Sequence, residues 1–164
     1  MHMNPDLKRS IILEHYQNPK NKNLVDDNSY ILKNMNNESC IDEVNVQVKI
    51  EDGIVKDVRF DGEACAMCTS SSSIMVETLI GKTIEEVKEI LINYNNMIDE
   101  KEYDPDILES AIVYDDVYKQ PNRKKCVLLP WWGMEKVIEE VESNRKWNSF
   151  SQGSKFWFFY LTSR

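Results

Sequence analysis

The chain has 164 residues, of which 41% are hydrophobic, so it can bury the core of one domain without disulfide bonds. Its 20 lysine and arginine residues stand against 28 aspartate and glutamate residues, which gives a net charge of −8. This acidic balance argues against binding to nucleic acid or to an anionic membrane surface. We see no signal-peptide pattern and no apolar run near the roughly 20 residues of a membrane helix, so we expect a cytoplasmic protein.

Residue periodicity predicts a helix and then a β-hairpin in the first part of the chain. Apolar side chains at helical spacing predict a helix over residues 5–18. Alternating apolar and polar side chains predict strands over residues 44–50 and 54–60, joined by a turn at 51–53 into an antiparallel pair. A further strand is plausible in residues 28–33.

Helical patterns dominate the second part. The serine-rich stretch that opens residues 69–81 is interpreted as the start of a helix, because apolar residues follow at helical spacing. A capping box predicts another helix over 83–94. Residues 95–105 are expected to form a polar loop, and helices are expected over 106–118 and 131–147.

The last residues, 148–164, differ from the rest of the chain. They contain five consecutive aromatic residues at 156–160 with no periodicity. We therefore expect one domain in residues 1–147, followed by an aromatic tail of unknown status.

Cysteines at the ends of the predicted hairpin suggest a metal site. Cys40 precedes its first strand and Cys65 follows its second, so the two thiols can meet, and Asp42 can point into the same space. A loop before the last helix could bring Cys126 to them. Three thiolates and a carboxylate suit tetrahedral Zn²⁺, and they would also suit iron.

Two other interpretations of the cysteines remain open. Each cysteine could be a small buried hydrophobic residue, which is the common fate of a free thiol. Alternatively, Cys65 and Cys68 could form a Cys-X-X-Cys redox or metal pair, although no βαβ pattern surrounds them.

Four motifs, in order between about Leu7 and Val141, resemble the U-type iron–sulfur cluster assembly proteins, the family of IscU, SufU and the NifU N-terminal domain. The first is similar to a His-Tyr-x-x-Pro-x-Asn signature, and each of the others contains one cysteine of the family's metal site. In this sequence they read His15-Tyr16-Gln17-Asn18-Pro19-Lys20-Asn21, Asn37-Glu38-Ser39-Cys40-Ile41-Asp42, Phe60-Asp61-Gly62-Glu63-Ala64-Cys65-Ala66 and Arg123-Lys124-Lys125-Cys126-Val127-Leu128-Leu129-Pro130-Trp131.

The resemblance implies an α+β fold of the SufE/NifU-like kind, with a small antiparallel sheet of about three strands and helices packed mainly on one face. It also implies a zinc site of Cys40, Asp42, Cys65 and Cys126. The SufU type takes persulfide sulfur from a cysteine desulfurase (SufS-like), with Cys40 as the acceptor, in a sulfurtransferase-like role. The alternative is an IscU-like scaffold that assembles and transfers a [2Fe–2S] cluster.

Two features favour the SufU type over IscU. Lys125 stands where IscU-type proteins place a histidine ligand, and the segment before Cys126 is longer, by roughly residues 96–118. The sequence also departs from the family, with Ile41 in place of glycine beside Asp42 and Cys68 in place of serine. Cys68 could be an incidental small residue, a substitute ligand or an oxidation partner of Cys65. We interpret His15 as a packing or hydrogen-bonding residue and not as a ligand.

Overall fold

The computed structural model describes residues 3–37 and 41–151, with side chains described up to residue 147. This part of the chain forms three strands, four α-helices and three short 3₁₀ helices. In chain order these are α1 (Pro5–Gln17), β1 (Ile31–Asn36), β2 (Glu43–Glu51), β3 (Ile54–Asp61), α2 (Ala66–Leu79), α3 (Ile84–Ile98), η1 (Pro105–Ile107), η2 (Glu109–Tyr114), η3 (Val117–Lys119) and α4 (Pro121–Ser151).

The three strands form an antiparallel sheet in the order β1-β2-β3. The alternating valines of β2, at positions 44, 46 and 48, are fully buried on the face that the helices cover. On the other face, Gln47 exchanges hydrogen bonds with the backbone of Val25, which holds the long loop after α1 against the sheet. These observations confirm the predicted α+β fold with a three-stranded sheet and the predicted hairpin.

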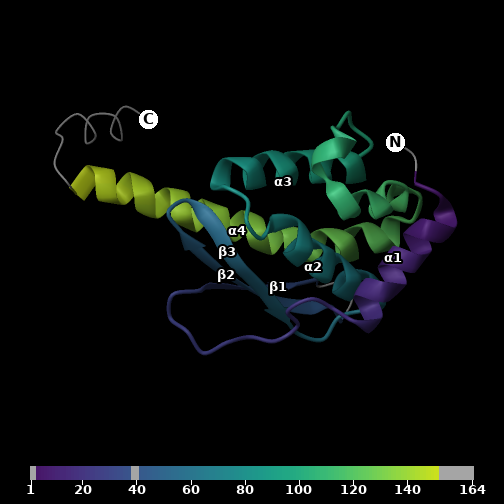
Figure 1. Cartoon of the computed structure of the whole chain (residues 1–164), viewed down its shortest axis with the longest axis horizontal. Coiled ribbons are helices and arrows are strands. Elements are labelled where there is room, and N and C mark those ends of the chain that lie inside the picture. Colours follow the sequence, from purple (N-terminus) through teal and green to yellow (C-terminus); the bar gives the residue numbers. More distant parts are fainter. Residues whose placement is uncertain (1–2, 38–40, 152–164) are drawn as a thin grey trace.

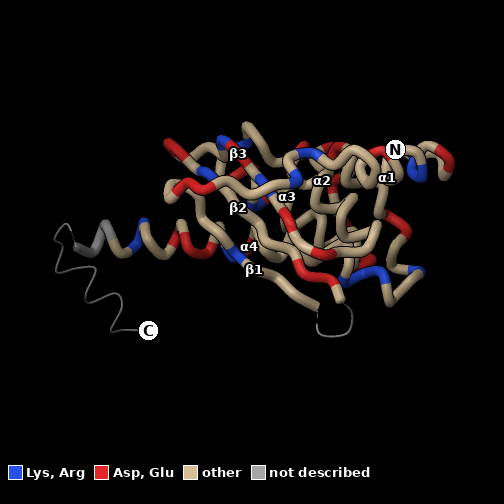
Figure 2. Tube along the Cα trace, turned by 90° about the horizontal axis from the view of Figure 1, so that it is seen from below, with Lys and Arg blue, Asp and Glu red and all other residues tan. Residues whose placement is uncertain are grey.

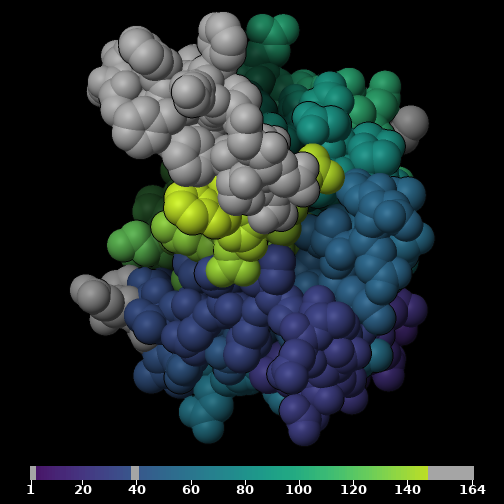
Figure 3. All heavy atoms as spheres, turned by 90° about the vertical axis from the view of Figure 1, so that its left-hand side faces the viewer, coloured from purple at the N-terminus to yellow at the C-terminus, as the bar shows by residue number. Residues whose placement is uncertain are grey.

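The helices lie on one side of the sheet in two layers (Figure 1). Helices α2 and α4 pack directly on the strands, and α3 lies beyond α4. Gly133 allows the close approach of α4, because a Cβ atom at this position would lie 2.9 Å from Cγ2 of Val46. Seen from the end at which α4 leaves the domain, its yellow turns emerge between the teal residues of α3 and the blue residues of the sheet (Figure 3).

Several predicted boundaries are wrong. Strand β1 spans 31–36 and not 28–33, and α3 continues to Ile98, four residues into the predicted loop. Residues 106–118 do not form one α-helix but contain 3₁₀ turns. In this segment Leu108, Ile112 and Val117 are buried in the core, and short 3₁₀ helices of this kind commonly connect longer elements.

The last helix begins at Pro121, ten residues before the predicted start. Proline at the first helical position is a common start signal, and here it is the signal that sequence analysis missed. Pro130 lies inside α4, where it removes the donor that would bond to the carbonyl group of Cys126. The helix continues because its next turn is held in the core, with Trp131 fully buried and stacked on Tyr94 at a ring-centroid distance of 4.0 Å.

The surface of the described chain has mixed charge. Figure 2 shows Asp and Glu spread along many elements with Lys and Arg interspersed, without a broad basic face in the described part. Within residues 3–37 and 41–151, no helix combines the length and the hydrophobicity needed to cross a membrane. Of the expected aromatic tail, the backbone of α4 continues to Ser151, and residues 152–164 lie outside the described part.

Candidate metal centre

Asp42 lies one residue before β2 and is 2% exposed. Its Oδ1 atom accepts a hydrogen bond from the backbone N–H of Cys65 at 2.7 Å, and its Oδ2 atom lies 3.5 Å from Cys65 Sγ. Ile41 does not prevent this arrangement, because its own side chain points out and is 86% exposed. The predicted meeting of Asp42 and Cys65 at the end of the hairpin is therefore seen in the structure.

Cys65 is the N-cap residue of α2, and a tight turn after β3 positions it. Gly62 makes this turn with φ at +139°, and a Cβ atom there would lie 2.1 Å from the carbonyl oxygen of Glu43, so only glycine fits. The N–H of Glu43 in turn donates to the carbonyl of Glu63 at 2.8 Å. The start of β2 and the start of α2 are thereby fixed to each other.

Cys126 comes to the site from α4 and not from a loop, which corrects the prediction. It lies in the second turn of the helix and is 6% exposed. The sulfur of Cys126 also contacts the carbonyl oxygen of Asn122 at 3.7 Å. A helix holds this thiol more rigidly than the expected loop would.

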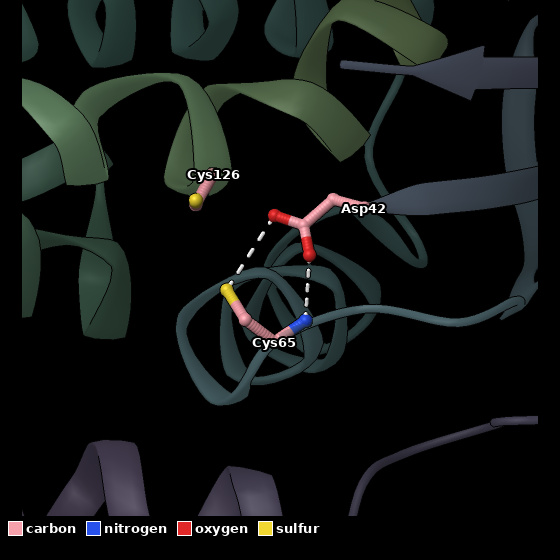
Figure 4. Close-up of side chains that lie close together, drawn as sticks. All are labelled: Asp42, Cys65 and Cys126. Carbon is pink, nitrogen blue, oxygen red and sulfur yellow. Dashed lines mark hydrogen bonds between the residues drawn. The ribbon is translucent and has the colours of Figure 1, made fainter. Parts of the chain in front are cut away.

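The three side chains converge from three separate elements (Figure 4). One ligand atom each from Asp42, Cys65 and Cys126 all lie within 4.8 Å of one another. Two sulfur atoms and one carboxylate oxygen at this spacing match three of the four positions of a tetrahedral zinc site.

The electrostatics of the group also fit a cation. Burial raises the pKa of the Cys126 thiol far above its ordinary value, and the adjacent Asp42 carboxylate and Cys65 thiol raise it further. Three acidic groups held together in this way repel one another once ionised. A bound divalent cation reverses this, because it keeps coordinating thiols deprotonated.

The sequence contains two further cysteines, Cys40 and Cys68. Cys40, the fourth member of the predicted ligand set, lies outside the described residues, so its place in the site stays a prediction. Cys68 is fully buried, and the group of ligand atoms defined above does not include it. The interpretation of Cys68 as a substitute ligand therefore gains no support.

His15 and Lys125 do not belong to the group. His15 is buried, its Nδ1 atom lies 2.7 Å from the hydroxyl of Ser73, and its Nε2 atom lies 3.1 Å from a carboxylate oxygen of Glu77. The interpretation as a packing and hydrogen-bonding residue is confirmed. Lys125 is exposed on α4.

A buried serine network supports the turn that carries Cys126, and sequence analysis did not identify this role. The hydroxyl of Ser71 donates to the carbonyl of Val127 at 2.7 Å and accepts from the indole N–H of Trp131 at 3.0 Å. Tyr94 donates to the same carbonyl at 2.8 Å. These bonds join α2 and α3 to α4 directly beside Cys126.

Replacing Ser71 by alanine is therefore expected to destabilise the fold by about 1–3 kcal/mol, because a buried indole N–H loses its acceptor. The matched control is Ser72→Ala. Ser72 is equally buried, but its hydroxyl bonds only within its own helix, to the carbonyl of Cys68 at 2.8 Å. Alanine should be tolerated there to within about 1 kcal/mol, because it favours helix. Denaturant unfolding compares the two variants, and equal losses would contradict the role of Ser71.

An open pocket of about 730 Å³ gives access to the site from the side of α1. Cys65 contributes to its wall, together with Tyr16, Lys22 and Ile41. A partner molecule can approach Cys65 through this pocket.

Comparison with known proteins identifies the family of the chain. Residues 7–125 match the model of the NifU-like N-terminal domain. The chain belongs to the NifU-like N-terminal domain family. It is 36% identical to the zinc-dependent sulfurtransferase SufU of Bacillus subtilis over 137 residues, which cover 83% of this chain and 92% of that protein. It is 29% identical to the iron–sulfur cluster assembly scaffold protein IscU of Thermotoga maritima over 130 residues, or 79% and 91% of the two chains.

A solved structure from the same family has the same architecture. The SufU of Fervidobacterium islandicum, described as an iron–sulfur cluster assembly scaffold protein for the SUF system, superposes with a TM-score of 0.74 at 34% identity. The match covers 78% of this chain and 93% of that one. The recognition of a SufU-like, NifU-type fold from the sequence is thus confirmed.

Proposed function

We propose that this protein is a SufU-type sulfur acceptor that takes persulfide sulfur from a cysteine desulfurase and holds zinc with Cys40, Asp42, Cys65 and Cys126. One observation carries the proposal: Asp42, Cys65 and Cys126 converge from three elements with the donor atoms that zinc prefers. The similarity to a protein named as a zinc-dependent sulfurtransferase supports it. In this proposal residues 1–147 carry the function, in the reducing cytoplasm that keeps thiols free.

Cys40 is the proposed acceptor. Its thiolate attacks the outer sulfur of the desulfurase persulfide, so a sulfur–sulfur bond to Cys40 forms while the bond within the persulfide breaks. The electron pair of the broken bond stays on the desulfurase cysteine, which leaves as a thiolate. Zinc, when bound, keeps its cysteine ligands deprotonated near neutral pH.

Asp42 and its neighbours hold the rest of the site in place during this transfer. The hydrogen bond from the N–H of Cys65 fixes one carboxylate oxygen of Asp42, which leaves the other directed at the thiols. Ile41 and Tyr16 present exposed apolar surface at the rim of the adjoining pocket. We expect the desulfurase to contact this rim, because exposed apolar groups beside a polar site are typical of protein contacts.

The second candidate is a scaffold that assembles a [2Fe–2S] cluster, and the similarity to the IscU of Thermotoga maritima favours it. The described residues favour it less. Lys125 is exposed at the position where IscU-type proteins are expected to supply a histidine ligand. His15, the only described histidine, is already bonded to Ser73 and close to Glu77.

Metal analysis and a turnover assay distinguish the two functions. We expect the purified chain to be colourless with about one zinc ion per chain, and to accelerate a SufS-like desulfurase. Removal of zinc by a chelator should abolish the acceleration, and added zinc should restore it. A brown protein that carries iron and leaves desulfurase turnover unchanged would overturn the proposal in favour of the scaffold.

A further inference from the structure

Cys65 and Cys68 differ sharply in exposure although they are three residues apart. Cys65 is partly exposed and lines the open pocket described above, whereas Cys68 is fully buried. A reagent from solution therefore reaches Cys65 first. Cys68 is shielded from such a reagent by its burial.

The two cysteines share the first turn of α2. Cys65 is the N-cap residue, and its sulfur accepts a hydrogen bond from the backbone N–H of Cys68 at 3.4 Å. The sulfur of Cys65 thus lies against the residue that carries the second thiol. Two cysteines separated by two residues at the start of a helix form the arrangement that thiol–disulfide proteins use for reversible oxidation.

We propose that Cys65 and Cys68 form a reversible disulfide when hydrogen peroxide oxidises Cys65, and that this disulfide removes Cys65 from the metal-ligand group. The Cys65 thiolate first attacks one peroxide oxygen, the O–O bond breaks, and Cys65 sulfenic acid and hydroxide form. The Cys68 thiol then attacks the sulfenic sulfur, a sulfur–sulfur bond forms, and water leaves. The thiol pair loses two electrons and the peroxide gains them.

Cys126 is the competing partner, since its sulfur lies within 4.8 Å of that of Cys65. The position of Cys68 in the chain favours it over Cys126. Its thiol is on the same helical turn as Cys65, and closing so short a segment has a small entropic cost. Cys126, by contrast, is on α4 and is 61 residues away in the sequence.

The disulfide would protect the site. A sulfenic acid without a resolving thiol oxidises further to sulfinic acid, which ordinary thiols do not reduce. With Cys68 beside it, Cys65 stops at a disulfide that a dithiol reductant can open. Formation of the disulfide does not depend on the proposed function, whereas release of zinc by it does.

Peptide mapping tests the inference directly. Trypsin should release residues 60–82 as one peptide that contains Cys65 and Cys68, while Cys40 and Cys126 fall in the peptides 34–49 and 126–136. After hydrogen peroxide treatment and alkylation of the full chain, we expect peptide 60–82 to be unalkylated and lighter by two hydrogen atoms. Dithiothreitol should reverse this. A link from peptide 60–82 to either other peptide, or sulfinic acid on Cys65, would overturn the inference.

The same samples report on the metal. In the zinc-loaded chain, a colorimetric chelator should detect zinc release in step with the disulfide. A chain that binds no zinc yet still forms the disulfide would overturn the proposed function and leave the disulfide intact as a finding. A chain that holds zinc and never forms the disulfide would overturn the disulfide inference and leave the proposed function standing.

Cys68→Ser is the decisive variant, and Cys68→Ala guards against a folding defect of a buried hydroxyl. Both should bind zinc normally before oxidation, because Cys68 is outside the ligand group. After peroxide and then dithiothreitol, we expect the wild-type chain to recover at least about fivefold more zinc-binding capacity than either variant. Equal recovery would overturn the role of Cys68.

Discussion

Replacing Cys40 by alanine is expected to abolish the stimulation of desulfurase turnover, a loss of at least about 100-fold in the stimulated rate, because the variant has no nucleophile to receive the sulfur. Zinc should still bind, more weakly, through Asp42, Cys65 and Cys126 with water as the fourth ligand, as in zinc sites that keep one open position. The measurements are desulfurase turnover and zinc content on the same preparation.

The controls separate acceptance of sulfur from binding of metal. Cys40→Ser should also lose stimulation, since a hydroxyl group is a poor nucleophile towards sulfur. Cys68→Ser should retain it, because Cys68 lies outside the ligand group. Full stimulation by Cys40→Ala would remove Cys40 as the acceptor, and a search for the acceptor would then turn to Cys65.

Replacing Asp42 by alanine is expected to weaken zinc binding by roughly two orders of magnitude or more, because the site loses a ligand and the anchor of Cys65 together. The anchor is the 2.7 Å hydrogen bond from the Cys65 N–H to the carboxylate. Competition with a chelator of known affinity at constant pH measures the change. Asp42→Asn is the matched variant, since it can keep the hydrogen bond while losing the charge. Its zinc affinity should lie between that of the wild type and that of Asp42→Ala.

The zinc-free form of Asp42→Ala should differ from the zinc-free wild type in thiol acidity and in stability. Removing the carboxylate lowers the pKa of the Cys126 thiol, because Asp42 is one of the groups that raise it. It also leaves the backbone N–H of Cys65 without its acceptor, so the zinc-free variant should be less stable to denaturant than the zinc-free wild type by about 1–3 kcal/mol. Full zinc occupancy in Asp42→Ala would mean that another group completes the site.

Sequence analysis located the parts of the site that depend on local pattern. The alternation in β2 and β3 places Asp42 and Cys65 at the same end of a hairpin. In the structure, Oδ2 of Asp42 lies 3.5 Å from Sγ of Cys65. The period-two pattern is unambiguous because one face of these strands is buried and the other is not. The serine-rich start of α2 was likewise identified as a helix because the residues after it continue with helical spacing.

Sequence analysis failed where tertiary packing overrides local preference. The last helix is predicted to begin at residue 131, directly after Pro130, yet α4 runs through Pro130 because Trp131 and the residues around it are buried in the core. The 3₁₀ turns before α4 follow the shape of the core and have no period of their own. The role of Ser71 could not be predicted either, since its partners Val127 and Trp131 lie on another helix that is distant in the sequence.

The proposed ligands lie just before β2, at the N-cap of α2 and on α4, and this separation has a consequence during synthesis of the protein. Cys126 belongs to the last helix of the described domain, so a nascent chain that exposes only the hairpin and α2 offers an incomplete set of donors. Metal capture at this centre therefore waits for α4 to dock, since a tetrahedral ion gains little from ligands that are not yet assembled. Under the proposed function, zinc occupancy therefore distinguishes completed domains from truncated ones.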